Sequence, residues 1–224
     1  MDIIKFITGG YDKQDYILKH IKVIGTEDAL FYTNSNFLDT ISEVEYHYKY
    51  YDLRPTDIVL DIGTCIGAFS LKVNKKVSYV HSIEPVMTEP LKRNISLNNA
   101  NNITIYEYAL GDGNDITIDW HGNIKTVKTY SLTDIISMCG GHIDFLKCDC
   151  EGAEWNIKSD EIKNIRRIEM EVHNVDNNHP TSYFENMLND NGFIYNITHI
   201  SYNLFLISAK KKDNKKTDGE LTWL

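Results

Sequence analysis

Short apolar runs alternate with polar, helix-compatible segments along most of the chain. The runs that predict strands cover residues 58–62, 77–83, 103–110, 143–150 and 167–172. Strands joined by helical crossovers lie parallel in one sheet, so the alternation predicts an α/β fold with helices on both faces. Two final runs, 193–198 and 204–209, are joined by a short link and are expected to pair antiparallel.

Helical segments are predicted between most of these runs. They cover residues 36–51, 69–73, 89–99, 131–139 and 181–191. In the first of them Phe37, Ile41, Val44 and Tyr48 recur at helical spacing, which predicts a face packed on the core. Core packing is the simpler role for Tyr48, and a lid over a ligand is the alternative. Residues 112–130 carry two short runs around a turn and predict a hairpin insertion.

The pattern divides the chain into three parts. Residues 1–57 are expected to form an N-terminal extension whose helix packs on the core, and the first 35 of them show no strong period. Residues 58–209 form one α/β domain. Residues 210–224 begin with a run of lysines and are expected to be a basic, solvated and mobile tail.

Composition narrows the classes of function. The 224 residues include 32 acidic and 23 basic side chains, which give a formal net charge of −9. This charge repels phosphate backbones and disfavours a nucleic-acid-binding role. Hydrophobic residues make up 42% of the chain, close to ordinary globular usage, so extensive disorder is not expected.

Targeting signals and paired cysteines are not evident. No apolar stretch approaches the ~20 residues of a membrane-spanning helix, and Asp2 stands where a signal peptide carries basic residues. Cys65, Cys139, Cys148 and Cys150 show no Cys-x-x-Cys spacing and are expected to be free thiols. We therefore expect a cytoplasmic protein with no membrane partner, and its oligomeric state is unknown.

The segment 59–67, Val-Leu-Asp-Ile-Gly-Thr-Cys-Ile-Gly, joins the first sheet strand to its helix. In a doubly wound sheet this turn lies beside the ligand-binding crevice. Gly63 and Gly67 let a ligand approach the backbone, although a tight turn needs glycine in any case. Glu84 closes the next strand about 20 residues after Gly63, where a carboxylate accepts the hydroxyls of a ribose. Together these features predict a nucleoside site.

Asp61 distinguishes among nucleoside ligands. It stands where a dinucleotide-binding loop has its first glycine, and an acid there repels a pyrophosphate. The same acid serves the ammonium group of a methionine-like moiety, directly or through water. S-adenosylmethionine therefore fits this loop, whereas an NAD-dependent oxidoreductase is disfavoured.

The stretch from about Glu43 to His173 resembles the FkbM family of S-adenosylmethionine-dependent methyltransferases. The matching pieces are Val59–Gly63 with Gly67, Ile83-Glu84-Pro85, Asn94 with Leu97-Asn98, Ala109-Leu110-Gly111, Phe145–Glu154 and Glu171-Val172-His173. The Lys-x-Asp-x-Glu-Gly-x-Glu block among them is far more specific than the glycine loop. The resemblance implies a Rossmann-like class I methyltransferase sheet, mainly parallel, with an antiparallel C-terminal strand pair.

The resemblance also implies which residues bind the cofactor. They are Asp61, Gly63, Thr64, Gly67, Glu84, Pro85, Ala109 and Leu110. Glu84 takes the ribose hydroxyls, and residues 109–110 lie by the adenine. Thr64-Cys65 replaces the Ala-Asn that is common in this loop, which is a departure from the family pattern.

Ionisable residues gather at the ends of two neighbouring strands and predict the acceptor side of the site. They are Lys147, Asp149, Glu151, Glu171, His173 and Asn174. Lys147, Asp149 and Glu151 alternate onto one face of the fourth strand, and an ion pair between Lys147 and Asp149 is the structural alternative. The set forms either a base and clamp for a hydroxyl or a Mg²⁺ site made by Asp149, Glu171 and Asn174.

His173 is the natural base, because the unperturbed pKa of histidine lies near 6.5, and Asp149 or Glu151 could hold or replace it. The sequence predicts an O-methyltransferase that acts on a hydroxyl of a sugar, glycoside or related small metabolite. The acceptor class rests on the resemblance. A non-catalytic S-adenosylmethionine-binding module and a methyltransferase with a nitrogen acceptor are the alternatives.

Overall fold

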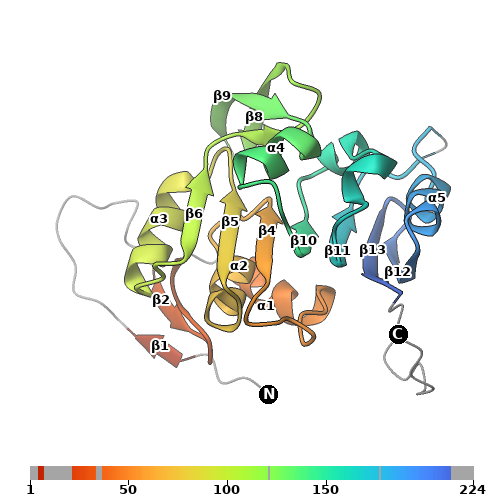
Figure 1. Ribbon diagram of the computed structural model, residues 1–224. Helices are drawn as coiled ribbons and strands as arrows, with labels where there is room; N and C mark the ends of the chain where they lie inside the picture. The colour runs from red at the N-terminus through yellow and green to blue at the C-terminus, as the bar shows by residue number, and fades with distance from the viewer. Residues whose placement is uncertain (1–4, 8–21, 34–36, 121, 177, 213–224) are drawn as a thin grey trace.

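A seven-stranded sheet forms the centre of the computed structural model, which describes residues 5–7, 22–33, 37–120, 122–176 and 178–212 (Figure 1). Its strands, in spatial order, are β12 (Phe193–Ser201), β13 (Leu204–Lys211), β11 (Arg167–Val172), β10 (Phe145–Cys148), β4 (Ile58–Ile62), β5 (Tyr79–Ile83) and β6 (Ile103–Tyr106). The strands from β11 to β6 run parallel. β13 is antiparallel to β11 and β12, so the predicted α/β sheet with its antiparallel closing pair is confirmed.

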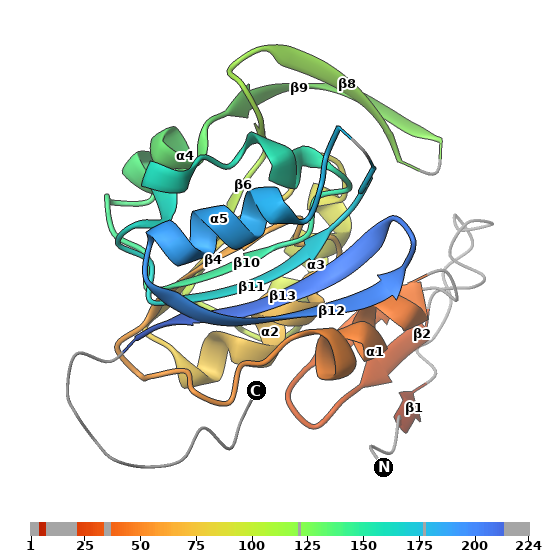
Figure 2. The same cartoon turned by 90° about the vertical axis from the view of Figure 1, so that its right-hand side faces the viewer.

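Helices cover both faces of this sheet. They are α1 (Leu38–His47), α2 (Ala68–Val73), α3 (Thr88–Leu97), α4 (Leu132–Met138) and α5 (Ser182–Asp190), with the 3₁₀ turns η3 (Asn74–Lys76), η4 (Ala153–Asn156) and η5 (Ser159–Ile162). Figure 2 shows α4 and α5 on one face and α1 and α2 on the other. Side chains alternate along a strand, so Leu60 joins the core with α4 and α5 while Val59 joins the core with α1 and α2.

Local chemistry sets several helix boundaries. The hydroxyl of Ser131 caps α4 by accepting a hydrogen bond from Asp134 N at 3.1 Å. α5 ends just before Gly192, whose φ of 69° lies in the left-handed region that glycine tolerates. The first helix is shorter than the predicted 36–51, because it ends at His47 and the backbone of Tyr48 is already extended.

A second, small sheet in the N-terminal extension was not predicted from the sequence. It contains β1 (Lys5–Ile7), β2 (Lys22–Gly25) and β3 (Leu30–Thr33). β3 lies against α3, and two asparagine side chains from this region hydrogen-bond to the backbone of β3, as a neighbouring strand would. Asn98 accepts a hydrogen bond from Leu30 N at 2.8 Å and donates to Leu30 O at 2.6 Å, and Asn94 accepts from Tyr32 N at 2.7 Å. These side chains tie the extension to the α/β domain.

The predicted strand at 103–110 is divided in the structure. Its first part is β6, and its last two residues form β7 (Ala109–Leu110), which pairs in parallel with β9 (Asn123–Tyr130). β8 (Asp115–Trp120) and β9 form the predicted hairpin. The hairpin is the arc at the top of Figure 2, where it lies beyond the end of the main sheet.

The last strand extends further than the sequence predicted. β13 continues through Lys210 and Lys211, and Lys211 N donates to Arg166 O at 2.9 Å. The predicted mobile tail therefore begins inside a strand, and its residues 213–224 lie outside the described part of the chain. Among the described residues, no helix has the length and apolar character needed to cross a bilayer.

Candidate functional site

A cavity of about 560 Å³ opens at the carboxyl ends of β4, β5, β10 and β11, a volume typical of small-molecule sites. The predicted site residues that line it are Gly63, Thr64, Glu84, Pro85, Ala109, Leu110, Lys147, Asp149, Glu151, Glu171 and His173. α1 and the hairpin strand β8 also contribute, through residues such as Val44 and Ile118. Asp61, Gly67 and Asn174 do not line the cavity, although each was predicted to belong to the site.

The loop after β4 is shaped by its packing against the end of β10. Gly63 has a φ of 76°, and a Cβ at this position would lie 1.6 Å from Asp149 O. Gly67 has a φ of 95°, and its Cβ would lie 2.8 Å from Leu91 Cδ1. Contact with the backbone of Asp149 thus requires glycine at 63, whereas at Gly67 the positive φ favours glycine, because Leu91 Cδ1 is the end of a flexible side chain. The turn accounts for Gly67, which was predicted to face the ligand.

Glu84 lies at the end of β5 and holds the loop in place. Its Oε2 accepts a hydrogen bond from Cys65 N at 2.7 Å, and its Oε1 accepts from Val86 N and Met87 N, both at 2.8 Å. Burial raises the pKa of Glu84, and the three amide hydrogen bonds act in the opposite direction. A carboxylate has about four acceptor sites, so one remains for a ribose hydroxyl rather than the two that the sequence predicted.

Asp61 is buried behind the cavity and does not reach a ligand directly. Its Oδ2 accepts a hydrogen bond from Ser70 Oγ at 2.7 Å, and its Oδ1 lies 3.4 Å from Lys147 Nζ. Lys147 Nζ also donates to Gly63 O at 3.0 Å and lies 3.5 Å from Asp149 Oδ2. Burial lowers the pKa of Lys147, but Asp61 and Asp149 raise it by more. Lys147 is therefore a fixed cation that connects the loop to Asp149.

Asp149 and Glu171 form the acidic end of the cavity, and α1 closes over them. Tyr48 Oη donates to Asp149 Oδ2 at 2.8 Å and lies 3.4 Å from Glu171 Oε2. His47 Nδ1 lies 2.9 Å from Glu171 Oε2. Tyr48 is 5% exposed, so it is a core residue that also hydrogen-bonds into the site.

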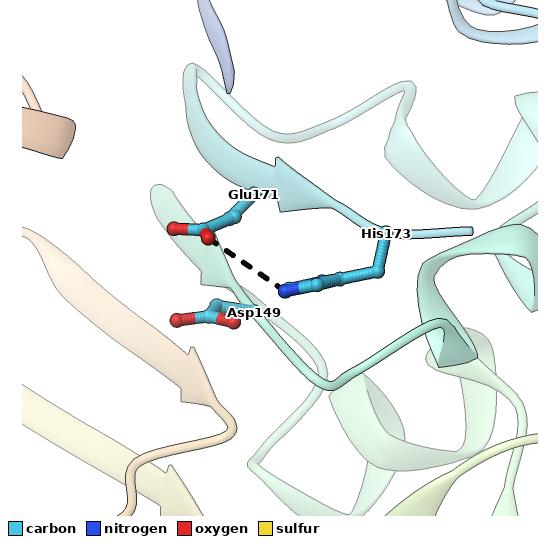
Figure 3. Close-up of side chains that lie close together, drawn as sticks. All are labelled: Asp149, Glu171 and His173. Atoms are coloured by element: carbon cyan, nitrogen blue, oxygen red, sulfur yellow. Dashed lines mark ion pairs between the residues drawn. The ribbon is translucent and has the colours of Figure 1, made fainter. Parts of the chain in front are cut away.

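His173 follows β11 and points toward Glu171 and Asp149 (Figure 3). Its Nε2 lies 3.6 Å from Glu171 Oε1 and 3.7 Å from Glu151 Oε2, and its Nδ1 lies 3.4 Å from Glu154 Oε1. Burial lowers the pKa of His173, but the surrounding carboxylates, Glu154 foremost, raise it to about 9. The raised pKa favours the protonated imidazole and so argues against His173 as the base; this role stays a prediction.

Glu154 shapes the turn that carries the acidic residues. It is fully buried, and its two oxygens accept hydrogen bonds from Cys150 N at 2.6 Å and Gly152 N at 2.8 Å. Glu151 and Gly152 both have positive φ, at 58° and 105°. This tight turn carries Glu151 out to the exposed rim of the cavity instead of leaving it on a strand face with Lys147 and Asp149.

The same end of the cavity contains a possible set of metal ligands. Asp149, Glu171 and His173 each offer one ligand atom, and these atoms lie within 4.8 Å of one another. Asn174 does not line the cavity, and its Nδ2 donates to Glu151 O at 3.5 Å. The Asp149–Glu171–Asn174 set stays a prediction. Oxygen ligands suit Mg²⁺, whereas an imidazole is more typical of transition-metal sites.

Comparison with known protein families adds an independent finding. Residues 92–219, more than half of the chain, match a family described as a methyltransferase domain. The chain belongs to this methyltransferase family. A search of curated proteins finds no match. The family match does not test the resemblance of this methyltransferase to FkbM proteins, which stays a prediction.

Solved structures support the same fold for the methyltransferase. TYW2 from M. jannaschii in complex with AdoMet has a TM-score of 0.52 and 16% identity, covering 92% of this chain and 90% of that one. For the fibrillarin pre-rRNA processing protein from Methanococcus jannaschii the TM-score is 0.52 and the identity 13%, and the match covers 94% of this chain and 99% of that one. For an rRNA methylase from Streptococcus thermophilus the TM-score is 0.51 and the identity 11%, and the match covers 77% of this chain and 92% of that one. At these identities the likeness establishes the Rossmann-like methyltransferase fold alone.

Sequence reasoning missed several residues of the methyltransferase site. Nothing in the sequence singles out His47, and Glu154 stands out only as the last residue of the Lys-x-Asp-x-Glu-Gly-x-Glu block. Ile116 and Ile118 come from the hairpin and line the cavity, but their alternation predicted only a strand. Glu154 carried a usable signal, because an acid in a glycine-rich turn after a strand often caps backbone amides. His47 carried none, since its partner Glu171 is far away in the chain.

Proposed function

We propose that the protein is an S-adenosylmethionine-dependent O-methyltransferase that acts on an uncharged hydroxyl acceptor such as a sugar, a glycoside or a related small metabolite. The observation that carries this proposal is the position of Asp149, Glu171 and His173 at one end of a cavity whose other end is the Glu84 loop. The FkbM resemblance supports the sugar class of acceptor.

The loop end of the cavity fits the nucleoside half of the cofactor. Glu84 has one free acceptor site for a ribose hydroxyl, and Ala109, Leu110 and Ile118 provide apolar surface for an adenine. When bound, S-adenosylmethionine supplies an electrophilic methyl group. Lys147, on β10, is already held by Asp61 and Asp149.

The acidic end of the cavity supplies the groups for acceptor activation. Asp149 would take the proton of the acceptor hydroxyl, whose oxygen gains the methyl group as the methyl–sulfur bond breaks and S-adenosylhomocysteine is released. His173, as a cation, orients Glu171 and can donate to the acceptor oxygen. Tyr48 holds Asp149 at 2.8 Å, which fixes its position. Such base catalysis contributes roughly 10²–10⁴-fold, and alignment of the reacting atoms contributes more.

The charge of the cavity argues for an uncharged acceptor. Its described lining includes Glu43, Asp149, Glu151 and Glu171, and Lys147 is the sole lysine or arginine among those lining residues. Lys147 is held by Asp61 and Asp149, and the imidazole of His173 lies beside Glu151, Glu154 and Glu171. Both cationic side chains of that lining are therefore already paired with carboxylates, which leaves neither free to bind a phosphate or a carboxylate of an acceptor. Phosphorylated sugars and RNA are therefore disfavoured as acceptors.

A labelled methyl-transfer assay tests the proposal. Purified protein and S-adenosylmethionine with a tritiated methyl group are incubated with neutral glycosides, phosphorylated sugars, amines and RNA. We expect transfer to neutral glycosides and a loss of about 10²-fold or more in Asp149→Asn, with S-adenosylhomocysteine binding retained. Asp160→Asn, at an exposed position, is the matched control.

Other outcomes of the assay separate the alternatives. Transfer to amines alone would indicate a nitrogen acceptor, and cofactor binding without transfer to any compound would indicate a non-catalytic module. Unchanged turnover in Asp149→Asn would contradict the assignment of the base.

A metal-dependent form of the same reaction is favoured by the three ligand atoms of Asp149, Glu171 and His173. In that form a divalent cation such as Mg²⁺ lowers the pKa of the acceptor hydroxyl. The assay is repeated after chelation and with added Mg²⁺ or Mn²⁺. Loss of transfer on chelation, restored by one of these cations, would support the metal-dependent form.

A further inference from the structure

A second hollow is formed by η4, the loop after β11 and the start of α5. It has a volume of about 350 Å³, and the proposed reaction uses none of it. Three aromatic rings (Trp155, His179 and Tyr183) and three polar side chains (Asn178, Ser182 and Asn186) line it. We call this space the aromatic hollow.

Two rings of the aromatic hollow have their polar atoms engaged by the backbone. Trp155 Nε1 donates to His173 O at 2.7 Å, and Tyr183 Oη donates to Ile157 O at 2.6 Å. The ring of Trp155 lies 4.9 Å from that of His179 and 5.9 Å from that of Tyr183, between centroids. His179 Nδ1 lies 3.2 Å from Asp176 Oδ1. The carbon atoms of these rings offer an apolar platform to a ligand.

The loop that supplies His179 has a defined shape. Asp176 Oδ1 accepts hydrogen bonds from Asn178 N at 2.7 Å and His179 N at 2.8 Å. These bonds lower the pKa of Asp176. Tyr183 is anchored in the first turn of α5 and is 39% exposed. The platform is therefore formed before a ligand arrives, which reduces the entropy lost on binding.

The aromatic hollow adjoins the acceptor end of the main cavity. Ala153 and His173 line the main cavity, and Trp155 follows Ala153 by two residues and hydrogen-bonds to the carbonyl of His173. η4 and the chain at His173 are thus a wall shared by the two spaces. Glu84 is carried by β5, and the aromatic hollow lies beside the loop after β11. Because β10 and β4 separate these two strands in the sheet, the aromatic hollow lies on the side of the main cavity away from Glu84.

The chemistry of the aromatic hollow matches a neutral carbohydrate. A sugar ring has a C–H face that stacks on an aromatic ring and a rim of hydroxyls that hydrogen-bond to amide side chains. Among the described residues that line the hollow, none is Asp, Glu, Lys or Arg. RNA bases also stack on such rings, but RNA binding requires cations for its phosphates.

We propose that the aromatic hollow binds uncharged sugar residues of the acceptor that neighbour the sugar carrying the methylated hydroxyl. The acceptor is then an oligosaccharide or a glycan chain rather than a free monosaccharide. This assignment rests on the proposed function for its link to methyl transfer, whereas sugar binding in the hollow is measurable by itself.

Binding to an array of neutral oligosaccharides of one to six residues, with single-stranded RNA and phosphorylated sugars as further probes, tests the assignment. Full-length wild type is compared with Tyr183→Ala, which removes a ring, and Tyr183→Phe, which keeps the ring and removes the hydrogen bond to Ile157. Tyr202→Ala changes a tyrosine that is 92% exposed elsewhere on the surface. Thermal unfolding and S-adenosylhomocysteine binding confirm that each variant is folded.

We expect wild type to bind oligosaccharides more tightly than the matching monosaccharides, Tyr183→Ala to lose about fivefold or more in affinity, and the other two variants to stay within about twofold. Equal loss in Tyr183→Ala and Tyr183→Phe, binding of RNA alone, or no glycan binding by folded wild type would overturn the assignment. Glycan binding that Tyr183→Ala weakens, without methyl transfer to any bound glycan, would overturn the proposed function and leave the hollow as a sugar site.

Discussion

Glu84 is the side chain on which we expect cofactor binding to depend most directly, because it accepts hydrogen bonds from three backbone amides and lines the cavity. In Glu84→Gln one end of the side chain becomes a donor that cannot accept from those amides. We expect S-adenosylhomocysteine affinity, measured by calorimetry, to fall at least about tenfold, since a hydrogen bond to a charged group contributes about 1.5–3 kcal/mol. Glu89→Gln, at an exposed position in α3, is the control, and equal affinities in the two variants would contradict the role of Glu84.

The pKa of His173 predicts a pH-dependent contribution to stability. A histidine whose pKa rises from 6.5 to about 9 on folding stabilises the protein fully below pH 6.5. This contribution is lost as the pH rises through about 9. We expect His173→Gln to be less stable than wild type at pH 6, with the difference shrinking by pH 9.5, in urea unfolding. A difference that stays constant with pH would mean that the imidazole is not held as a cation.

At the scale of elements, α1 is the part of the extension that completes the site. Its last residue, His47, and the following Tyr48 contact Glu171 and Asp149 across the cavity. The helix also packs on α2 through Val44 and Phe69 in a shared core. Two of the side chains that contact Asp149 and Glu171 therefore come from outside the α/β domain itself.

Tyr48→Phe tests this connection. The change leaves the ring in the core and removes the hydrogen bond to Asp149, so we expect a loss of about 1.5–3 kcal/mol in the free energy of unfolding. Tyr46→Phe, whose residue is 77% exposed, is expected to change it by less than about 0.5 kcal/mol. Denaturant titration of both variants measures the difference, and similar values for the two would contradict the contact.

At the scale of the whole molecule, Arg167 ties three segments together. It is fully buried and donates to Lys49 O at 3.0 Å and Ala209 O at 2.8 Å, while its guanidinium also pairs with Glu169. Burial raises the pKa of Glu169 to about 7 even though Arg167 lowers it. The link joins the extension, β11 and β13.

Arg167→Met leaves the carboxylate of Glu169 buried without its cation. We expect a loss of about 3–5 kcal/mol in the free energy of unfolding, because breaking a buried pair costs more than removing both partners. The double variant Arg167→Met/Glu169→Met is expected to recover part of this loss in the same denaturant titration. A double variant less stable than the single one would contradict this account.

The main sheet could be predicted from the sequence because its buried parallel strands are continuous apolar runs, as at Ile58–Ile62. β3 could not be predicted in this way. Its position depends on Asn94 and Asn98, which are more than 60 residues away in the chain. No local pattern of apolar residues records such a side-chain contact.

The candidate site shows the same limit. Strand ends brought Asp149, Glu171 and His173 together as the sequence predicted, because register fixes where neighbouring parallel strands end. The charge of His173 could not be predicted, since it depends on the buried Glu154 beside it. Asp61 does not line the cavity, although the sequence predicted it in the site, because it is fully buried beside Lys147 of the adjacent strand, 3.4 Å from its Nζ.

The two hydrogen bonds of Asn94 connect the loop after β4 to β3 in the N-terminal extension, so a change in the loop is expected to affect the stability of β3. Asn94 Nδ2 donates to Ile66 O at 2.8 Å in the loop after β4, while its Oδ1 holds the amide of Tyr32. A ligand that rigidifies this loop should therefore slow hydrogen exchange at Tyr32, by thermodynamic reciprocity. Mass spectrometry with and without S-adenosylhomocysteine measures this slowing, which Asn94→Ala should abolish. The N-terminal strands would then report on the occupancy of a pocket that they do not touch.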